Sequence, residues 1–292
     1  MFILFNIVTI IMFYGPMRNL IALSLHNAYY SHIILIPFIS GYFMYLRRKA
    51  IFSDINYSYA AGIILMIVGG ILYLTGKTQG IKLDRNDYLS LMTFSSLIFW
   101  MGGFVLFFGI RAFRIGAFPL LFLIFLVPMP SLIMEKVIFL LQMGSAEAAY
   151  GFFKLTGIPF LREGVVFHFP GISVEVAKEC SGIRSSIALF IMGVILSNMF
   201  LQTGWRRIIL LSSVFPLAII KNGIRIVTLT LLALYIDESF ITNSKLHHDG
   251  GIIFFLIALT FLAPILWLLR KSEKRAGKVN KNQDKVDHII KG

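Results

Sequence analysis

One cysteine and the polar residues beside it form the first candidate for chemistry in this chain of 292 residues. Cys180 lies in the stretch Glu179-Cys180-Ser181-Gly182-Ile183-Arg184, where a long apolar segment begins. A thiol in the first turn of a helix meets the positive end of the helix dipole and free backbone N–H groups, which favour the thiolate. These N–H groups can also receive a developing oxyanion. We therefore favour a nucleophile over a small packing residue, and a lone cysteine excludes an intrachain disulfide.

The charged neighbours of this cysteine act in opposite directions. Arg184 follows Cys180 by four residues, so the two share a helical face and the guanidinium adds positive charge. Glu179 opposes the thiolate if its side chain points inward. The balance depends on side-chain orientations that the sequence leaves open.

Two further polar clusters interrupt later apolar segments. They are Lys221-Asn222-Gly223-Ile224-Arg225 and His247-His248-Asp249-Gly250-Gly251. Polar groups at membrane depth are costly, so such clusters are typical of functional sites. In a functional interpretation, Arg225 is a fixed cation for a reacting carbonyl or a leaving amine, with Asn222 as a polar partner. In a structural interpretation, Arg225 satisfies carbonyls or pairs with a carboxylate.

The two adjacent histidines also admit two interpretations. Either His247 or His248 is the general acid or base for a thiol, or both are solvated residues at a helix start. Two adjacent histidines and one distant cysteine do not match the ligand spacing of a zinc site. We therefore expect neither a metal nor another cofactor.

The elements that must position these clusters are apolar helices. Hydrophobic residues make up 58% of the chain and charged residues 14%, with a mean hydropathy of +0.82. Soluble domains are about 45–50% apolar and about 25% charged, so a water-soluble fold is excluded. A membrane helix needs about 20 mostly apolar residues. Eight candidate spans lie near residues 1–25, 29–46, 57–75, 88–110, 116–140, 182–201, 208–236 and 249–270.

The predicted fold is an all-α polytopic membrane protein with about eight transmembrane helices and a short β-hairpin insertion. Residues 1–270 are expected to form a single integral membrane domain. Residues 271–292 are expected to form a basic, disordered cytoplasmic tail. The Pro-Met-Pro sequence at residues 128–130 breaks the fifth span, so residues 131–153 are expected to lie at the membrane interface as an amphipathic helix.

Basic residues fall mostly on one side of these spans. That side carries 15 Lys and Arg against 4 Asp and Glu, a net charge of +11 out of +13, and the other side carries +2. The positive-inside rule then places the +11 side and both termini in the cytoplasm, and the three polar clusters near the outer surface. The charge therefore indicates topology and contact with anionic lipid headgroups, and it does not indicate nucleic acid binding.

A β-hairpin is predicted in the longest outer stretch, about residues 141–181. Two short strands, at residues 165–169 and 172–176, flank the turn sequence Pro170-Gly171. This hairpin would lie directly before the sixth span. Its edge near Glu175 could bind an extended peptide as an added strand.

Together, these motifs resemble those of a known family. The segments E-C-S-G-I-R-S-S, N-G-I-R-I-V and L-H-H-D-G-G-I-I-F-F resemble the three signature blocks of the exosortase/archaeosortase family. The segment G-I-P-F-L-R-E-G-V-V-F-H-F-P-G-I-S-V-E-V-A and the F-L-V-P-M-P break are also similar to that family. The resemblance covers about residues 118–270, which would form the catalytic half.

The resemblance implies a multi-pass membrane transpeptidase. Its substrates would be exported, membrane-anchored proteins with a C-terminal tail: a Pro-Glu-Pro type motif, a transmembrane helix and a basic end. Processing would take place at the outer face of the inner membrane.

The resemblance also implies a role for each site residue. Cys180 would be the nucleophile that forms an acyl-thioester, and Arg225 would protonate the leaving group or stabilise charge. The third residue is His in exosortases and Arg in archaeosortases, so this chain resembles the bacterial exosortases. The family's His-x-x-Gly-Gly block fits His247 and leaves His248 as the alternative.

Three other functions are compatible with parts of the sequence. An intramembrane cysteine protease would use the same groups but transfer the acyl group to water. A polytopic transporter would place Arg225, Glu179 and His247 along a polar pathway, but the cytoplasmic halves of the spans lack such residues. A nonenzymatic assembly factor gives no reason for three polar clusters at one depth.

Overall fold

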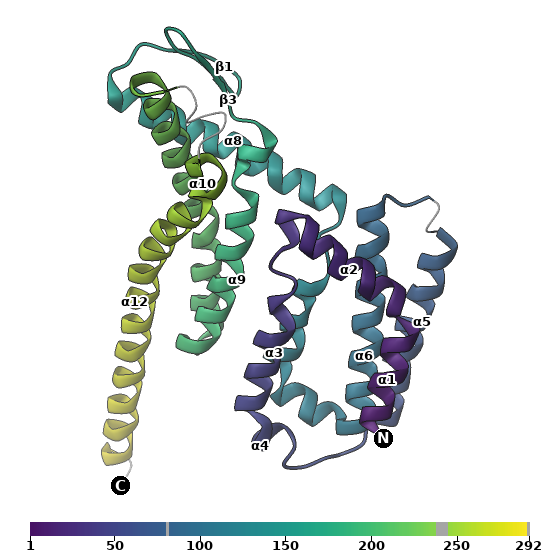
Figure 1. Cartoon of the computed structure of the whole chain (residues 1–292). Helices are drawn as coiled ribbons and strands as arrows, with labels where there is room; N and C mark the ends of the chain where they lie inside the picture. Colours follow the sequence, from purple (N-terminus) through teal and green to yellow (C-terminus); the bar gives the residue numbers. More distant parts are fainter. Residues whose placement is uncertain (80–81, 238–244, 291–292) are drawn as a thin grey trace. The chain divides into compact units, whose positions relative to one another are not determined.

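The computed structural model describes the backbone of the whole chain except residues 80–81, 238–244 and 291–292 (Figure 1). The description also leaves out the side chains of residues 79, 179, 245–252 and 277–290. The chain divides into two compact units, residues 1–135 and 136–292.

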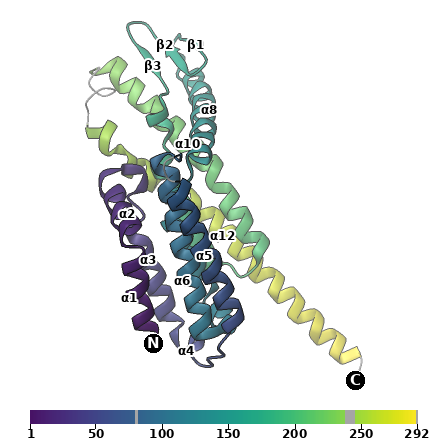
Figure 2. The ribbon, with the colours of Figure 1, turned by 90° about the vertical axis from the view of Figure 1, so that its right-hand side faces the viewer.

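The N-terminal unit is built of helices joined by short turns. Its elements are α1 Phe2–Met12, α2 Tyr14–His26, η1 Ala28–Tyr30, α3 Leu35–Leu46, α4 Arg48–Ile51, α5 Tyr59–Gln79, α6 Arg85–Ile115, α7 Ala117–Phe122 and η2 Leu123–Leu126. The helices α5 and α6 lie side by side (Figure 2). A Cβ added to Gly62 or Gly69 of α5 would lie 2.7 or 2.6 Å from backbone atoms of α6. These glycines therefore let the two helices approach closely, as small residues do between membrane helices.

The C-terminal unit combines long helices with a small sheet. Its elements are α8 Ser131–Thr156, which begins in the first unit, β1 Leu161–Glu163, β2 Val166–His168, β3 Ser173–Glu175, η3 Lys178–Ser181, α9 Ile183–Phe200, α10 Gly204–Tyr235 and α12 Lys245–Ile290. Apolar side chains join α9, α10 and α12 in one buried cluster that includes Leu189, Leu210 and Leu262. The helix α12 continues to Ile290, so the basic segment after residue 270 is helical in the structure. Its assignment as a cytoplasmic tail, like the single membrane domain, stays a prediction.

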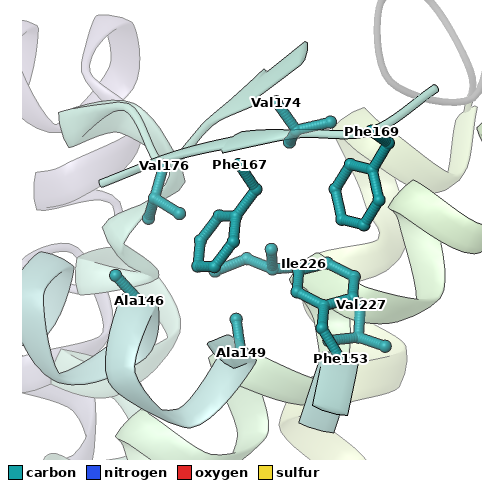
Figure 3. Close-up of a cluster of buried hydrophobic side chains, with 9 residues drawn as sticks. All are labelled: Ala146, Ala149, Phe153, Phe167, Phe169, Val174, Val176, Ile226 and Val227. Carbon is teal, nitrogen blue, oxygen red and sulfur yellow. The ribbon is translucent and has the colours of Figure 1, made fainter. Parts of the chain in front are cut away.

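The sheet is antiparallel with the strand order β1-β2-β3, and it lies over α8 and α10 (Figure 1). Gly164 and Gly171 make its two turns at φ 62° and 93°, a conformation that favours glycine. Figure 3 shows the buried cluster beneath it, formed by Ala146, Ala149, Phe153, Phe167, Phe169, Val174, Val176, Ile226 and Val227. The pair β2–β3 confirms the predicted hairpin, and β1 adds a third strand that the sequence did not predict.

The helical, polytopic membrane fold is confirmed. Among the described residues, five helices are long and apolar enough to cross a membrane: α5, α6, α9, α10 and the Ile253–Ala276 part of α12. The number rises to seven if two bent pairs each count as one span, α1 with α2 at 72° and α7–η2 with α8 at 88°. The second predicted span, residues 29–46, is not among these seven: it contains the 12-residue helix α3, which is shorter than the roughly 20 residues that a span needs.

Within each unit, segments that the charge distribution assigns to the basic side of the spans contact each other. Asp54, which follows α4, forms an ion pair with Arg111 of α6. Arg206 at the start of α10 pairs with Glu273 of α12 at 3.4 Å. Both contacts agree with the expectation that these segments share a side of the spans.

Candidate active site

Cys180 lies in the 3₁₀ turn η3, directly before α9. The sequence predicts this residue in the first turn of a helix, but α9 begins three residues later, at Ile183. Gly182 separates the two elements at φ 73°, a left-handed conformation that L side chains rarely adopt. The first-turn position is therefore wrong, and Cys180 lies on the turn that leads into the helix.

The carbonyl of Gly182 anchors this turn to α9. It accepts hydrogen bonds from the backbone N–H of Ser186 at 3.0 Å and from the hydroxyls of Ser186 and Ser185 at 2.8 and 3.0 Å. The Ser185 hydroxyl also accepts a hydrogen bond from the buried ammonium group of Lys221 in α10. Lys221 therefore links α10 to the hydrogen bonds that hold the cysteine turn.

Asn222 of α10 holds the same turn from a second direction. Its Nδ2 donates to the Cys180 carbonyl at 2.7 Å and to Ser145 Oγ of α8 at 3.0 Å. Asn222 and Ser145 are 1% and 0% exposed, so both bonds are shielded from water. A Cβ on Gly182 would lie 2.8 Å from Asn222 Oδ1, so space as well as conformation requires glycine there. The Asn222 amide therefore fixes the backbone of Cys180.

Cys180 and Arg225 line one cavity of about 50 Å³ between β3 and α10. The positively charged guanidinium and the thiol are therefore close to each other. The remaining lining residues are Val174, Glu175, Val176, Asn222, Ile226, Leu229 and Thr230. A cavity of this size has room for only a small group, such as water molecules or one peptide unit. The structure therefore brings together two of the three residues that the sequence singled out.

The structure describes the other residues from the sequence analysis only in part. The backbone of His247 and His248 belongs to α12, but their side chains lie outside the described residues, as does that of Glu179. The choice between the two histidines therefore stays a prediction. Arg184 is exposed, and the described lining of the cavity does not include it. Among the described side chains, no three His, Cys, Asp or Glu residues are grouped so that they could hold a metal ion.

Sequence reasoning missed Ser145 and Thr230. Helical periodicity could have found Thr230, because it lies eight residues after Asn222 and so on nearly the same face. Ser145 gave no local signal, because its contact depends on the close approach of α8 to α10. That approach occurs at Gly223, where an added Cβ would lie 2.7 Å from the Cβ of Ala148.

An ion pair fixes the sheet to α8. Arg162 of β1 donates to both carboxylate oxygens of Glu147, at 3.0 and 2.6 Å, and to the Gly164 carbonyl at 2.8 Å. The hydrogen bonds that Arg162 donates to Glu147 raise the pKa of Arg162, so the guanidinium stays charged. Because β3 forms one wall of the cavity, this ion pair helps to keep that wall in place.

Comparison with known proteins identifies the family. Residues 24–263, most of the sequence, match the family of transmembrane exosortases. No curated protein and no solved structure matches it. The matched range contains both Cys180 and Arg225, and it begins far upstream of the segment in which the motifs lie. The chain therefore belongs to the transmembrane exosortase family.

Proposed function

We propose that this exosortase family member is a membrane transpeptidase that uses Cys180 as its nucleophile. The shared cavity carries the proposal, because both Cys180 and Arg225 line it. A nearby guanidinium favours the thiolate, which is the reactive form of cysteine. The bond from Asn222 to the Cys180 carbonyl holds the nucleophile before substrate arrives, which lowers the entropic cost of the reaction.

The first half-reaction forms an acyl-enzyme. His247 takes the thiol proton, and the Cys180 thiolate attacks the carbonyl carbon of the scissile peptide bond. Arg225 stabilises the negative charge that develops on the carbonyl oxygen. The C–N bond then breaks, the proton on His247 passes to the leaving amine, and the acyl group remains on sulfur as a thioester.

The second half-reaction regenerates the enzyme. An amine or hydroxyl of an acceptor attacks the thioester carbonyl, its proton moves to the histidine, and the C–S bond breaks. The proton then passes from the histidine to the Cys180 sulfur, which restores the thiol. Water in place of the acceptor gives hydrolysis. An intramembrane cysteine protease therefore differs from a transpeptidase only in this step.

The substrates in this proposal are exported proteins with a C-terminal sorting tail of the Pro-Glu-Pro type. The charge distribution supports a cytoplasmic side at the +11 loops, with Cys180 near the outer surface of the inner membrane. A tail helix with a basic cytoplasmic end would then lie beside the spans and present its outer flank at the level of Cys180. Cleavage would release that helix into the bilayer.

The test is processing of a tailed reporter protein by the full-length protein in nanodiscs. Wild type is compared with Cys180→Ala, Arg225→Ala, His247→Ala and His248→Ala. We expect Cys180→Ala to lose about 10⁴-fold or more in rate, as loss of a nucleophile does in other hydrolases. The wild-type intermediate should appear by mass spectrometry as the enzyme plus the reporter fragment.

Each alternative has its own outcome in this experiment. Full processing by Cys180→Ala would exclude the thiol mechanism. Loss of processing in His248→Ala but not in His247→Ala would move the acid–base role to His248. A reporter fragment joined to an acceptor identifies a transpeptidase, and a fragment with a free carboxylate identifies a protease.

A further inference from the structure

Thr230 of α10 has a hydroxyl group that the fold does not use. Its side chain is 0% exposed and lines the cavity of Cys180. Thr230 Oγ1 has no hydrogen-bond partner among the residues that the structure describes. Many other helical hydroxyls donate to a carbonyl three or four residues earlier, including those of Thr9, Thr75, Ser197 and Ser213. Thr93 of α6 is a further buried helical hydroxyl without a partner among the described residues, but it does not line this cavity. Burying the Thr230 hydroxyl therefore costs free energy that a bound polar group would restore.

Asn222, which also lines this cavity, has a second unused polar atom. Its Oδ1 is also buried without a hydrogen-bond partner among the described residues. Thr230 lies eight residues further along α10, which is about 12 Å along the helix axis. Cys180 lies at the Asn222 end, because Asn222 donates to its carbonyl. An extended ligand that reaches Cys180 along this face of α10 can therefore bond to Thr230 two turns away.

The opposite wall of the cavity is a strand with an open edge. In the described part of the protein, β3 is the last strand of its sheet. Val176 N donates to Val165 O at 3.0 Å in continuation of the β2–β3 pair. Backbone groups alternate in direction along an antiparallel strand, so the N–H groups of Ser173 and Glu175 point away from β2. An open edge of this kind pairs with an extended peptide.

We propose that the Thr230 hydroxyl binds a backbone peptide group of the substrate, about two helical turns along α10 from the end at which Cys180 attacks. This inference rests on the proposed function, because it states how the substrate binds in the same cavity. A hydroxyl both donates and accepts, so it can bond to a backbone C=O or N–H of any substrate residue. The cavity volume of about 50 Å³ fits one such unit. Thr230 is thus a substrate-contacting residue that takes no part in the bond changes.

The substitution Thr230→Val tests this inference, because it keeps the shape of the side chain and removes the hydroxyl. The full-length protein in nanodiscs processes a reporter with a C-terminal sorting tail, and kcat, KM and the melting temperature are measured. We expect kcat/KM to fall about tenfold, mainly through KM, since one hydrogen bond to the bound substrate is lost. The melting temperature should stay the same or rise, because an unpaired buried hydroxyl is gone.

Two further variants separate substrate contact from structural support. Thr230→Ser keeps the hydroxyl and should retain most of the wild-type kcat/KM. Thr228→Val makes the same change on the same helix, at a half-buried residue outside the described cavity lining, and should behave as wild type.

Wild-type kcat/KM in Thr230→Val would overturn the inference. So would a joint loss of activity and melting temperature that Thr230→Ser does not restore, because that result indicates a structural role. A fall in kcat with unchanged KM would also contradict it. Cys180→Ala in the same assay tests the proposed function independently. If that variant processes the reporter as wild type does, the thiol mechanism is wrong, irrespective of the results for the Thr230 variants.

Discussion

Two asparagines, one in each unit, show how the same side chain serves two purposes in this protein. Asn86 of α6 uses both ends of its amide: Oδ1 accepts from Tyr30 OH at 2.7 Å, and Nδ2 donates to the Met129 carbonyl at 2.7 Å. Asn222 of α10 uses its Nδ2, and its Oδ1 has no hydrogen-bond partner among the described residues. A complete set of bonds stabilises a fold, whereas a buried unmade bond lowers stability and is typical of a site that binds something.

The cavities beside these two asparagines differ in volume, and the larger one lies beside the fully hydrogen-bonded Asn86. The cavity near Asn86, in the N-terminal unit, has a volume of about 700 Å³, and the one near Asn222 about 50 Å³. Volume alone would therefore favour the N-terminal unit as the active region. The unmade hydrogen bonds and the cysteine favour the smaller cavity, so the chemistry of the lining is more informative here than its size.

The substitution Asn222→Ala is expected to have the largest effect in this comparison. Without the bond to its carbonyl, Cys180 is no longer held in place, and a displacement of about 1 Å can lower a rate about 100-fold. Processing of the tailed reporter measures this loss. Ser145→Ala is the matched control, because it removes the other partner of the Asn222 amide and leaves the bond to Cys180. Equal losses in both variants would contradict a specific role for the Cys180 bond.

Asn86→Ala should show the reverse pattern, with a loss of stability and little loss of activity per folded molecule. The change leaves the Tyr30 hydroxyl and the Met129 carbonyl without their partner, which should lower the free energy of unfolding by about 2 kcal/mol or more. Thermal unfolding in detergent and the reporter assay measure the two quantities. A large fall in activity at unchanged stability would mean that this cluster also takes part in function.

Tyr30→Phe makes Asn86 resemble Asn222, because it leaves the Asn86 Oδ1 without its donor. We expect a smaller loss of about 1 kcal/mol in the free energy of unfolding. Thermal unfolding against wild type measures it. If the variant is as stable as wild type, an unmade bond costs little in this protein, and the contrast between the two asparagines loses its meaning.

Arg184→Ala should have the smallest effect, a change in processing rate within about twofold. The side chain is exposed, so solvent and salt screen its charge. The reporter assay at low and high salt checks this expectation. A large loss would restore the sequence-based role of Arg184 beside the thiol and would widen the active site beyond the described cavity.

Much of the site was predictable because its signals are local. The Pro170-Gly171 sequence indicated the hairpin, because a proline followed by a glycine occurs mainly in turns. The alternation of spans placed Cys180 and Arg225 at one level, and the structure puts them in one cavity. These predictions needed only periodicity, charge and turn chemistry.

The remainder depended on contacts between segments that are distant in sequence. Strand β1 includes Arg162 and Glu163 and has no apolar alternation of its own, so its pairing with β2 and the ion pair to α8 define it. The position of Cys180 before α9 depends on the left-handed Gly182, which packs against Asn222, forty residues later. Hydropathy alone could not show that the segment 29–46 ends in a helix of 12 residues.

A side chain introduced at Gly182 could be used to identify the natural substrates of this protein. In Gly182→Ala, the new methyl group would lie 2.8 Å from Asn222 Oδ1. This clash would displace the turn that carries Cys180, although every reactive group would still be present. Under the proposed function, such a variant binds tailed substrates but does not cleave them. An affinity-tagged variant expressed in the native cell would serve as a substrate trap. The proteins recovered with it would be identified by mass spectrometry.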